Sequence, residues 1–410
     1  MKRAELPLLT AIFLDLVGFG MAFPDISIRL RRMLAGEGVP MGWIGFLTGL
    51  VLASLFLTQF IVSPRWGALS DRIGRKPVVA ICTALSALSM LVYALTTSPW
   101  GVLVSRILAG FAAANVVVGQ AYLADQTTEK ERPAAMGRIG AAISVGLISG
   151  PAIGGWLAEL GGSRLLGFVA ASASAIGAIV LILFLPGTKP EEKVSTGRRP
   201  IFDFSLLKDT PQIKSFFWLA VLAWFALACL EGTFVPLLAV IFKYPQHLGP
   251  IAFGSERSVG GTVFGIESLI GFVVQGFFIT ALTKRLSTAS LLRLGYAMQG
   301  IGLVLTPFAP VLGVLLFFSA IYSIGMSVAG PTVNAACSTL TPPERQGEIF
   351  GLLQGARSIG FLLGPMIGGA LFDASHWAPY ALAGGIGLAA AALVPKLKGS
   401  PAESSTPTTA

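Results

Sequence analysis

The sequence predicts an all-α membrane protein whose twelve transmembrane helices form two parallel six-helix repeats. Three observations support this fold class: few charged residues, apolar segments of membrane-spanning length along nearly the whole chain, and one glycine-rich pattern that occurs twice. Of the 410 residues, 54% are hydrophobic and 12% are charged, whereas soluble proteins carry about 25% charged residues. A chain this apolar must bury its surface, which excludes disorder and favours lipid as the surroundings.

A helix that crosses the hydrocarbon layer needs roughly 20 apolar residues, and the chain provides twelve such segments. Short connections that are charged or rich in Pro and Gly separate them, as in polytopic helical membrane proteins. In the first half, the expected spans are 6–28, 43–64, 77–97, 99–124, 136–160 and 165–186. In the second half, they are 215–242, 259–282, 289–308, 311–336, 350–372 and 378–397.

The longest polar stretch, residues 187–214, divides the chain near its middle. We expect an N-terminal bundle at 1–186, a cytoplasmic linker at 187–214, a C-terminal bundle at 215–398 and a disordered Ser/Thr/Pro-rich tail at 399–410. Within the linker, residues 201–209 (IFDFSLLKD) fit either a short amphipathic surface helix or a solvated connection.

The positions of the basic residues predict the orientation of the chain. With the N-terminus in the cytoplasm, 21 of the 29 basic residues lie in cytoplasmic connections and tails, as the positive-inside rule requires. We therefore expect a multi-pass protein of the cell membrane (inner or plasma membrane) with both termini cytoplasmic. The net charge of +9 then reflects topology and lipid contact, and no nucleic-acid partner is expected. The basic residues expected on the outer side are Arg29, Arg31, Arg32, Arg164, Lys243 and Arg257.

A glycine-rich pattern, G-x8-G-x3-G-P-x2-G-G, occurs in the fifth and again in the eleventh expected helix, displaced by 214 residues. Such a duplication indicates two structural repeats, with a substrate site between them at mid-membrane. Small residues let another backbone approach closely, so the pattern fits a smooth surface on which two bundles move, or ordinary small-residue packing. The first copy comprises Gly137, Gly146, Gly150, Pro151, Gly154 and Gly155, and the second Gly351, Gly360, Gly364, Pro365, Gly368 and Gly369.

The connection between the second and third expected helices reads GALSDRIGRKP over residues 67–77, which is G-x-L-x-D-R-x-G-R-K. Together with the duplicated Gly-Pro helix, it resembles the major facilitator superfamily, specifically the twelve-helix drug:proton antiporter group. The resemblance covers residues 6–397. Residues 14–24 (LDLVGFGMAFP) are similar to the first helix of tetracycline/proton antiporters, and residues 103–110 (LVSRILAG) to the membrane-embedded arginine motif of that group.

The resemblance implies the major facilitator fold and a cytoplasmic latch in the 67–77 loop that closes when the chain faces outward. Asp71 would be stabilised by the N-terminal end of a neighbouring helix, which the resemblance suggests is the eleventh, and Arg72 and Arg75 would pair with Asp125. Simple retention of positive charge on the inner side does not explain the acid and the two glycines at these spacings. The expected latch residues are Gly67, Asp71, Arg72, Gly74, Arg75, Lys76 and Asp125.

Ionisable groups inside the membrane cost about 2.5–3.5 kcal/mol on insertion scales and are candidates for function. A carboxyl group that alternates between a desolvated site and a nearby cation can bind a proton on one side and release it on the other. Asp15 with Arg106, and Glu267 with Arg357, are the expected pairs. A static ion pair that fixes helix positions is the alternative for both. The candidates for proton coupling or substrate binding are Asp15, Arg106, Glu231, Glu267 and Arg357.

Enzyme, cofactor and metal motifs are absent from the sequence; no Gly precedes a Lys, which excludes a Walker-type nucleotide loop. We expect a proton-coupled secondary transporter that exports a small lipophilic compound, cationic or zwitterionic, by alternating access. Its partners would be that compound, protons and membrane lipid, and the unit a monomer. Open alternatives are an exporter of lipids, lysolipids or metabolites, a nutrient symporter, and a membrane sensor that transports nothing. The aromatic residues considered for the cavity are Phe19, Phe23, Phe111, Trp224, Phe225 and Phe272.

Overall fold

The computed structural model describes residues 5–128, 131–187, 211–342 and 345–394. The first half of the chain contains α1 (Glu5–Met21), α2 (Phe23–Gly36), α3 (Met41–Ile73), α4 (Arg75–Leu95), α5 (Pro99–Ala112), α6 (Asn115–Gln126) and α7 (Arg132–Phe184). The second half contains α9 (Pro211–Ile241), β1 (Gln246–Leu248), β2 (Ile251–Phe253), α10 (Glu256–Val273), the π-helical turn η1 (Val274–Phe278), α11 (Ile279–Arg285), α12 (Thr288–Leu305), the 3-10 turn η2 (Thr306–Phe308), α13 (Leu312–Thr339), α14 (Gln346–Ala374) and α15 (Ala378–Leu393).

Each expected span is helical over most of its described residues, which confirms the fold class. The first span consists of α1 and α2, the fourth of α5 and α6, and the eighth of α10, η1 and α11. The fifth and sixth spans are merged in α7, which breaks at Gly161 and Gly162; the φ of +66° at Gly162 is one that glycine adopts readily. Residues 201–209 and the tail 399–410 lie outside the described residues.

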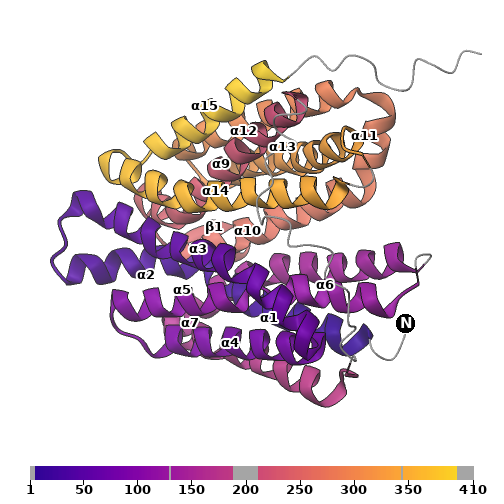
Figure 1. Cartoon of the computed structure of the whole chain (residues 1–410). Coiled ribbons are helices and arrows are strands. Elements are labelled where there is room, and N and C mark those ends of the chain that lie inside the picture. Colours follow the sequence, from indigo (N-terminus) through magenta and orange to yellow (C-terminus); the bar gives the residue numbers. More distant parts are fainter. Residues whose placement is uncertain (1–4, 129–130, 188–210, 343–344, 395–410) are drawn as a thin grey trace, which may run out of the picture.

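The two halves lie side by side, with the helices of the first half below those of the second in Figure 1. The α3–α4, α6–α7 and α11–α12 connections lie at the same end of the bundle as residues 5 and 394; we call this the tail end, on the right in Figure 1. The opposite end, with the α2–α3 and α14–α15 connections, is the distal end.

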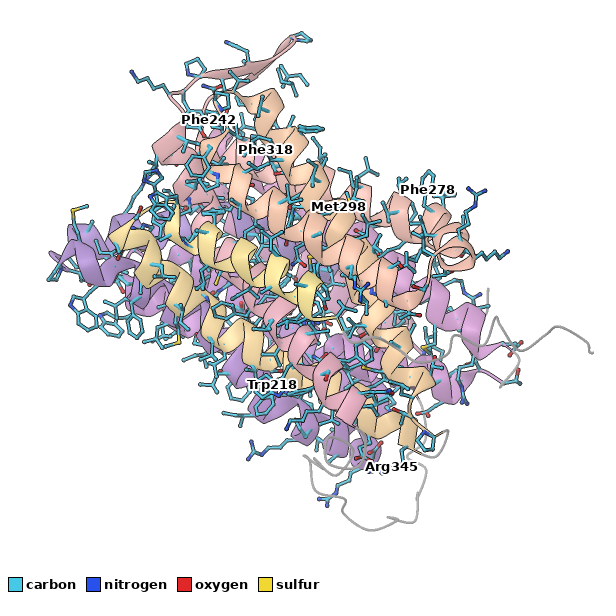
Figure 2. The ribbon with its side chains drawn as sticks, turned by 90° about the horizontal axis from the view of Figure 1, so that it is seen from above. Trp218, Phe242, Phe278, Met298, Phe318 and Arg345 are labelled. Carbon is cyan, nitrogen blue, oxygen red and sulfur yellow. The ribbon has the colours of Figure 1, made fainter. Side chains whose placement is uncertain are left out.

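Large apolar side chains cover the outside of the bundle. Trp218 is 51% exposed and Phe278 is 56% exposed, and Figure 2 shows side chains projecting around the ribbon. Among the described residues, nine helical stretches are long and apolar enough to cross a membrane, and α7 accounts for two spans. Because an apolar outer surface of this extent needs lipid around it, the chain is a multi-pass membrane protein.

The halves contact each other near the distal end and diverge toward the tail end. On the α3–α14 pair, a Cβ added at Gly45 would overlap the backbone of Gly369, and one at Gly49 would overlap that of Pro365. On the α7–α10 pair, a Cβ added at Gly261 would overlap the backbone of α7. On the tail side, by contrast, no atom lies within 4 Å of a Cβ added at Gly67, Gly137, Gly276 or Gly351. The conformation is therefore closed at the distal end.

Candidate functional site

Neutral hydrogen-bond donors hold the membrane-embedded carboxylate of the first half. Asp15 is buried on α1 and accepts hydrogen bonds from Asn115 Nδ2 on α6 and from Ser86 Oγ on α4, the latter at 3.2 Å. Ser174 of α7 lies beside the same carboxylate. Four helices of the first half thus converge on Asp15, and no ion pair to it is present among the described residues.

Asn115 reaches Asp15 because the fourth span is broken. Helix α5 ends at Ala112 and α6 begins at Asn115, so the backbone turns just before the amide. The Asn115 Oδ1 accepts a hydrogen bond from the N–H of Val116 at 2.6 Å, which leaves its NH₂ group for the carboxylate. Sequence reasoning missed this residue, although a single Asn inside an apolar run is a readable signal.

Arg106 lies apart from Asp15, so the expected pair is wrong in this conformation. Arg106 is buried on α5, where it donates to Ser105 Oγ at 3.1 Å, and its guanidinium lies 5.5 Å from the centre of the Tyr93 ring. Asp15 contacts α4 through Ser86, which is seven residues from Tyr93 and hence about 10 Å away along a helix. The two groups share a half but lie at different depths.

In the second half, the charge that interacts with Arg357 comes from Glu231 rather than from the expected Glu267. Glu231 on α9 and Arg357 on α14 interact electrostatically, whereas Glu267 on α10 hydrogen-bonds Ser319 on α13. The reason is that α9 packs beside α14, while Glu267 faces α13. Tyr322 of α13 interacts electrostatically with both acids, so the two carboxylates lie near one phenol.

Aromatic rings surround Arg357 where the two halves part. Its guanidinium lies 5.1 Å from the centre of the Trp224 ring and 5.4 Å from that of Phe361. Phe361 stacks on Phe56 of the first half, with ring centres 4.2 Å apart. Farther toward the tail end, no atom lies within 4 Å of a Cβ added at Gly67 of α3 or at Gly355 of α14. Of the expected cavity aromatics, Trp224 belongs to this cluster; Phe56 and Phe361 were not foreseen.

The tail-end loop forms a charge cluster centred on Arg75. Arg75 pairs with Asp71 at 2.6 Å and with Asp125 at 3.1 Å, and it donates to Ser70 Oγ at 2.5 Å. Gly74 makes this geometry possible because its φ of +96° joins α3 to α4 in a conformation that favours glycine. Arg72 is exposed and Lys76 half-buried. Both acids that pair with Arg75 in this cluster belong to the first half.

The duplicated glycines divide into three groups in both repeats, and the first glycine of each copy, Gly137 or Gly351, has no atom within 4 Å of an added Cβ. Most of them pack inside their own half: Cβ atoms added at Gly150 and Gly154 would overlap α1, and those added at Gly364 and Gly360 would overlap α9. The last glycine of each copy instead faces the other half. A Cβ at Gly155 would overlap Arg257 and Gly261 of α10, and one at Gly369 would overlap Gly45 of α3. Small-residue packing therefore explains the glycines inside each half, and the last glycine of each copy lies where the halves meet. Movement of the bundles across that contact stays a prediction.

The comparisons with known proteins agree with this architecture. The model of the Major Facilitator Superfamily matches residues 8–255 and 250–410, which is nearly the whole chain. The chain belongs to the Major Facilitator Superfamily. This superfamily member is a transporter and not an enzyme, and its sequence relatives include proteins named for drug resistance.

The similar proteins cover almost the full length of this transporter. Multidrug resistance protein 1 of Bacillus subtilis (strain 168) is 31% identical over 371 residues, 89% of each chain. Tetracycline resistance protein, class C, of Escherichia coli is 28% identical over 388 residues, 91% of each chain. The quinolone resistance protein NorA of Staphylococcus aureus is 28% identical over 390 residues, 93% of each chain.

Solved structures support the fold of this superfamily member. The human organic anion transporter MFSD10 (TETRAN) superposes with a TM-score of 0.67 at 21% identity, covering 96% of this chain and 99% of that one. The nucleoside transporter NupG superposes with a TM-score of 0.75 at 16% identity, covering 95% of this chain and 98% of that one. At these identities, the likeness concerns the fold alone.

Proposed function

We propose that this transporter is a proton-coupled antiporter that exports small lipophilic compounds, cationic or zwitterionic, from the cytoplasm by alternating access. The observation that carries the proposal is the separation of two charged sites in two halves. Asp15 lies among neutral donors in the first half, and Glu231, Glu267 and Arg357 lie beside aromatic rings in the second. The names of the relatives, which include multidrug, tetracycline and quinolone resistance proteins, support the export of drug-like compounds.

Asp15 supports proton coupling because a buried carboxylate without a neighbouring cation is costly in its charged form. Binding of a proton relieves this cost when the site is desolvated, and contact with water allows the proton to leave. Ser86 and Asn115 hold the carboxylate in place through either state, since both are neutral. A change in solvent access on alternation would then load and unload the group from opposite sides.

The cluster in the second half supports the proposed substrate class. The faces of Trp224, Phe361 and Phe56 offer flat apolar contact to a lipophilic ring system. Glu231 and Arg357 present both signs of charge within the same cluster, which suits a zwitterion or, after displacement of Arg357 from the acid, a cation. The excess of basic residues in the tail-end connections supports a cytoplasmic tail end, so the open side would face the cytoplasm.

The proposal is tested with the purified chain in proteoliposomes whose interior is more acidic than the bath. Protons that leave should drive accumulation of a compound, so we expect several-fold uptake of a lipophilic cation such as tetraphenylphosphonium or of a zwitterion such as tetracycline. Collapse of the pH gradient with nigericin should abolish the uptake. Equal accumulation without a pH gradient would overturn the coupling, and transport of only lysolipids or sugars would overturn the substrate class.

A matched control separates coupling from stability. Glu5 is a second buried carboxylate on α1, and it pairs with Arg138 of α7 at 2.9 Å near the tail end. Glu5→Gln removes one negative charge from the same helix, outside both charged sites. We expect this variant to retain gradient-driven uptake, whereas substitutions at the proposed coupling site should not.

A further inference from the structure

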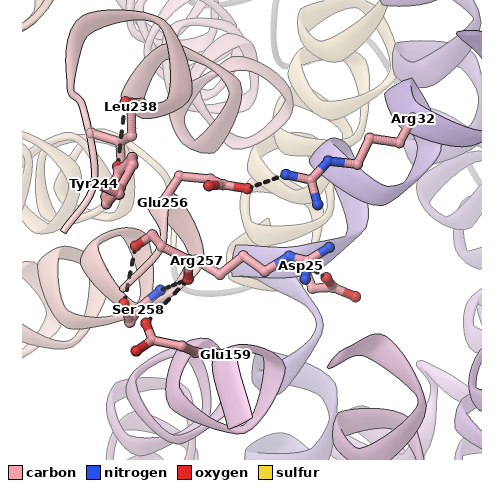
Figure 3. Close-up of polar contacts among 9 residues, drawn as sticks. Asp25, Arg32, Glu159, Leu238, Tyr244, Glu256, Arg257 and Ser258 are labelled. Atoms are coloured by element: carbon pink, nitrogen blue, oxygen red, sulfur yellow. Dashed lines mark hydrogen bonds and ion pairs between the residues drawn. The ribbon is translucent and has the colours of Figure 1, made fainter. Parts of the chain in front are cut away.

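Three ion pairs join the two halves at the distal end. Each has one partner on α2 and the other on α10 or α14, and Figure 3 shows two of them. The halves do not divide into one acidic and one basic surface, because α2 contributes an acid and two arginines. The pairs are Asp25–Arg257 at 2.8 Å, Arg32–Glu256 at 2.7 Å and Arg31–Asp373.

Asp25 is the most enclosed member of this group. It is completely buried, and it accepts a hydrogen bond from the Tyr93 hydroxyl at 2.6 Å within its own half. The cation on its other side, Arg257, comes from the second half. Arg29 supports the same place by donating to the carbonyl oxygens of Tyr93 and Thr96, at 2.6 and 2.5 Å. Asp25 is thus held by a partner that stays with it and by one that belongs to the other half.

The start of α10 is also anchored to the first half. Glu159 of α7 accepts a hydrogen bond from the N–H of Gly254 and another from Ser255 Oγ, each at 3.1 Å. Ser255 caps α10 by accepting a hydrogen bond from the N–H of Ser258. The segment that carries Glu256 and Arg257 is therefore fixed from α7 as well as from α2 (Figure 3).

These contacts account for basic residues that the positive-inside rule leaves unexplained. Of the six expected on the outer side, Arg31, Arg32 and Arg257 form the ion pairs between the halves, and Arg29 supports Tyr93. In this conformation, ion pairs between side chains therefore connect the two halves at the distal end.

We propose that the three ion pairs form a gate, the distal gate, and that Asp25 is the positioning residue that holds it shut. When the distal end opens, Arg257 must leave with the second half, while Asp25 remains bonded to Tyr93. Arg106, whose guanidinium lies near the Tyr93 ring, is a neighbour of this gate rather than of Asp15. The inference rests on alternating access in the proposed function, but on neither proton coupling nor the substrate class.

Distances between spin labels test the gate without any substrate. One label pair, at Glu37 and His376, reports the distal end, and a second, at Ile73 and Lys284, reports the tail end; all four positions are exposed. The native Cys82, Cys229 and Cys337 are buried, which limits background labelling. Electron–electron double resonance on the full chain in lipid nanodiscs then measures both separations for each variant.

We expect Asp25→Asn and Arg257→Gln to raise the ratio of distal-open to distal-closed molecules about tenfold or more. The distal distance should lengthen while the tail distance shortens, because alternation couples the two ends. Loss of packing alone would lengthen or broaden both distances, and that result would overturn the proposal. Unchanged distances in Arg257→Gln would overturn it as well. Arg257→Gln keeps the hydrogen bond between Tyr93 and Asp25. This variant therefore tests the gate even if Asp25→Asn does not fold.

Two further variants supply the control and the rescue. Arg164→Gln removes an exposed arginine at the distal end whose guanidinium lies over Phe168 of its own helix, so its distances should match those of the wild type. Arg32→Glu should shift the population toward the distal-open state, and adding Glu256→Arg should restore at least half of that shift. A double variant no more closed than Arg32→Glu would contradict attraction between the halves as the cause.

Discussion

At the scale of single residues, the buried acids Asp15 of α1 and Asp25 of α2 have different surroundings. Asp15 is surrounded by hydroxyl and amide groups, whereas Asp25 has an arginine from the other half. An isolated carboxylate in a low-dielectric interior is costly, and a paired one much less so. Asp15 is therefore suited to take up a proton or a cation, and Asp25 is suited to hold a protein contact.

We predict that Asp15→Asn loses at least 90% of the uptake driven by a pH gradient. The substitution keeps the shape of the side chain and removes both its charge and its titration. Exchange of labelled for unlabelled substrate at equal pH should persist, because exchange needs no net movement of protons. Both rates are measured in proteoliposomes, beside Glu5→Gln. Uptake equal to the wild type would transfer the coupling role to Glu231 or Glu267.

The sequence was enough to identify the charged residues inside the membrane, but not the side chains that each of them contacts. Asp15, Arg106, Glu231, Glu267 and Arg357 stand out because charge is rare in apolar helices. Their contacts depend on depth to within one helical turn and on which helices are neighbours, and a single sequence fixes neither. Arg32 and Glu256 are 224 residues apart, so no local pattern links them. The one signal of these contacts in the sequence was that several arginines lie on the expected outer side, where the positive-inside rule predicts few.

At the scale of elements, the repeated helix packs against its own half and also contacts the other half. Spacing alone identified the repeat, because each copy occupies the equivalent span in its half. Spacing did not reveal that Gly150 and Gly364 face the neighbouring helix of their own half, whereas Gly155 and Gly369 face the other half. The direction of each glycine depends on how its helix is rotated in the bundle, which the hydropathy of a uniformly apolar helix does not encode.

We predict that Gly155→Ala and Gly150→Ala have different effects despite similar overlap. Overpacking costs about 1–3 kcal/mol in each case. At Gly155, the added methyl group would overlap Arg257 and Gly261 only when the distal end is closed. It should therefore destabilise the distal-closed state, and the distance between the distal labels should increase. For Gly150, it falls on contact with α1 inside one half, so thermal stability should drop with little change in the distance distribution. The opposite assignment of effects would contradict the division of the glycines.

The tail-side glycines of the same pattern provide the control. No atom lies within 4 Å of a Cβ added at Gly137 or Gly351, and alanine lowers the entropy of the unfolded chain. We predict that Gly137→Ala and Gly351→Ala leave thermal stability unchanged or raise it by about 0.4–1 kcal/mol. Thermal unfolding in detergent, followed by tryptophan fluorescence, measures this effect. A clear loss of stability would mean that these glycines are packed in the populated state.

At the scale of the whole molecule, the charge clusters lie at opposite ends, and the distal one bridges the halves. At the tail end, Arg75 pairs with Asp71 and Asp125, and both acids belong to the first half. The expected contact of Asp71 with the eleventh helix remains a prediction for the opposite conformation. The fold class was fully predictable, because length, hydropathy and repetition act over the entire chain, whereas the conformational state was not.

We predict that Asp71→Asn changes stability by less than about 1 kcal/mol, because the Asp71 side chain is 55% exposed and Arg75 keeps Asp125. Transport should nevertheless fall at least tenfold, since the closed tail end would lose its latch. Uptake assays report the transport rate, and the labels at Ile73 and Lys284 report tail closure. Normal turnover in this variant would contradict the latch, while the distal gate would be unaffected by that outcome.

The stack of Phe56 on Phe361 divides α3 into two parts of unequal length. From Phe56, α3 extends 11 residues to Gly45 and 17 residues to its end at Ile73, about 16 and 26 Å respectively. If the rings act as the fulcrum, a separation of 1 Å at Gly45 corresponds to an opposite displacement of about 1.5 Å at the tail end, by the ratio of these lengths. A methyl group added at Gly369 would then push α3 and α14 apart at the distal end. The largest resulting displacement would be a narrowing of the opening at the tail end.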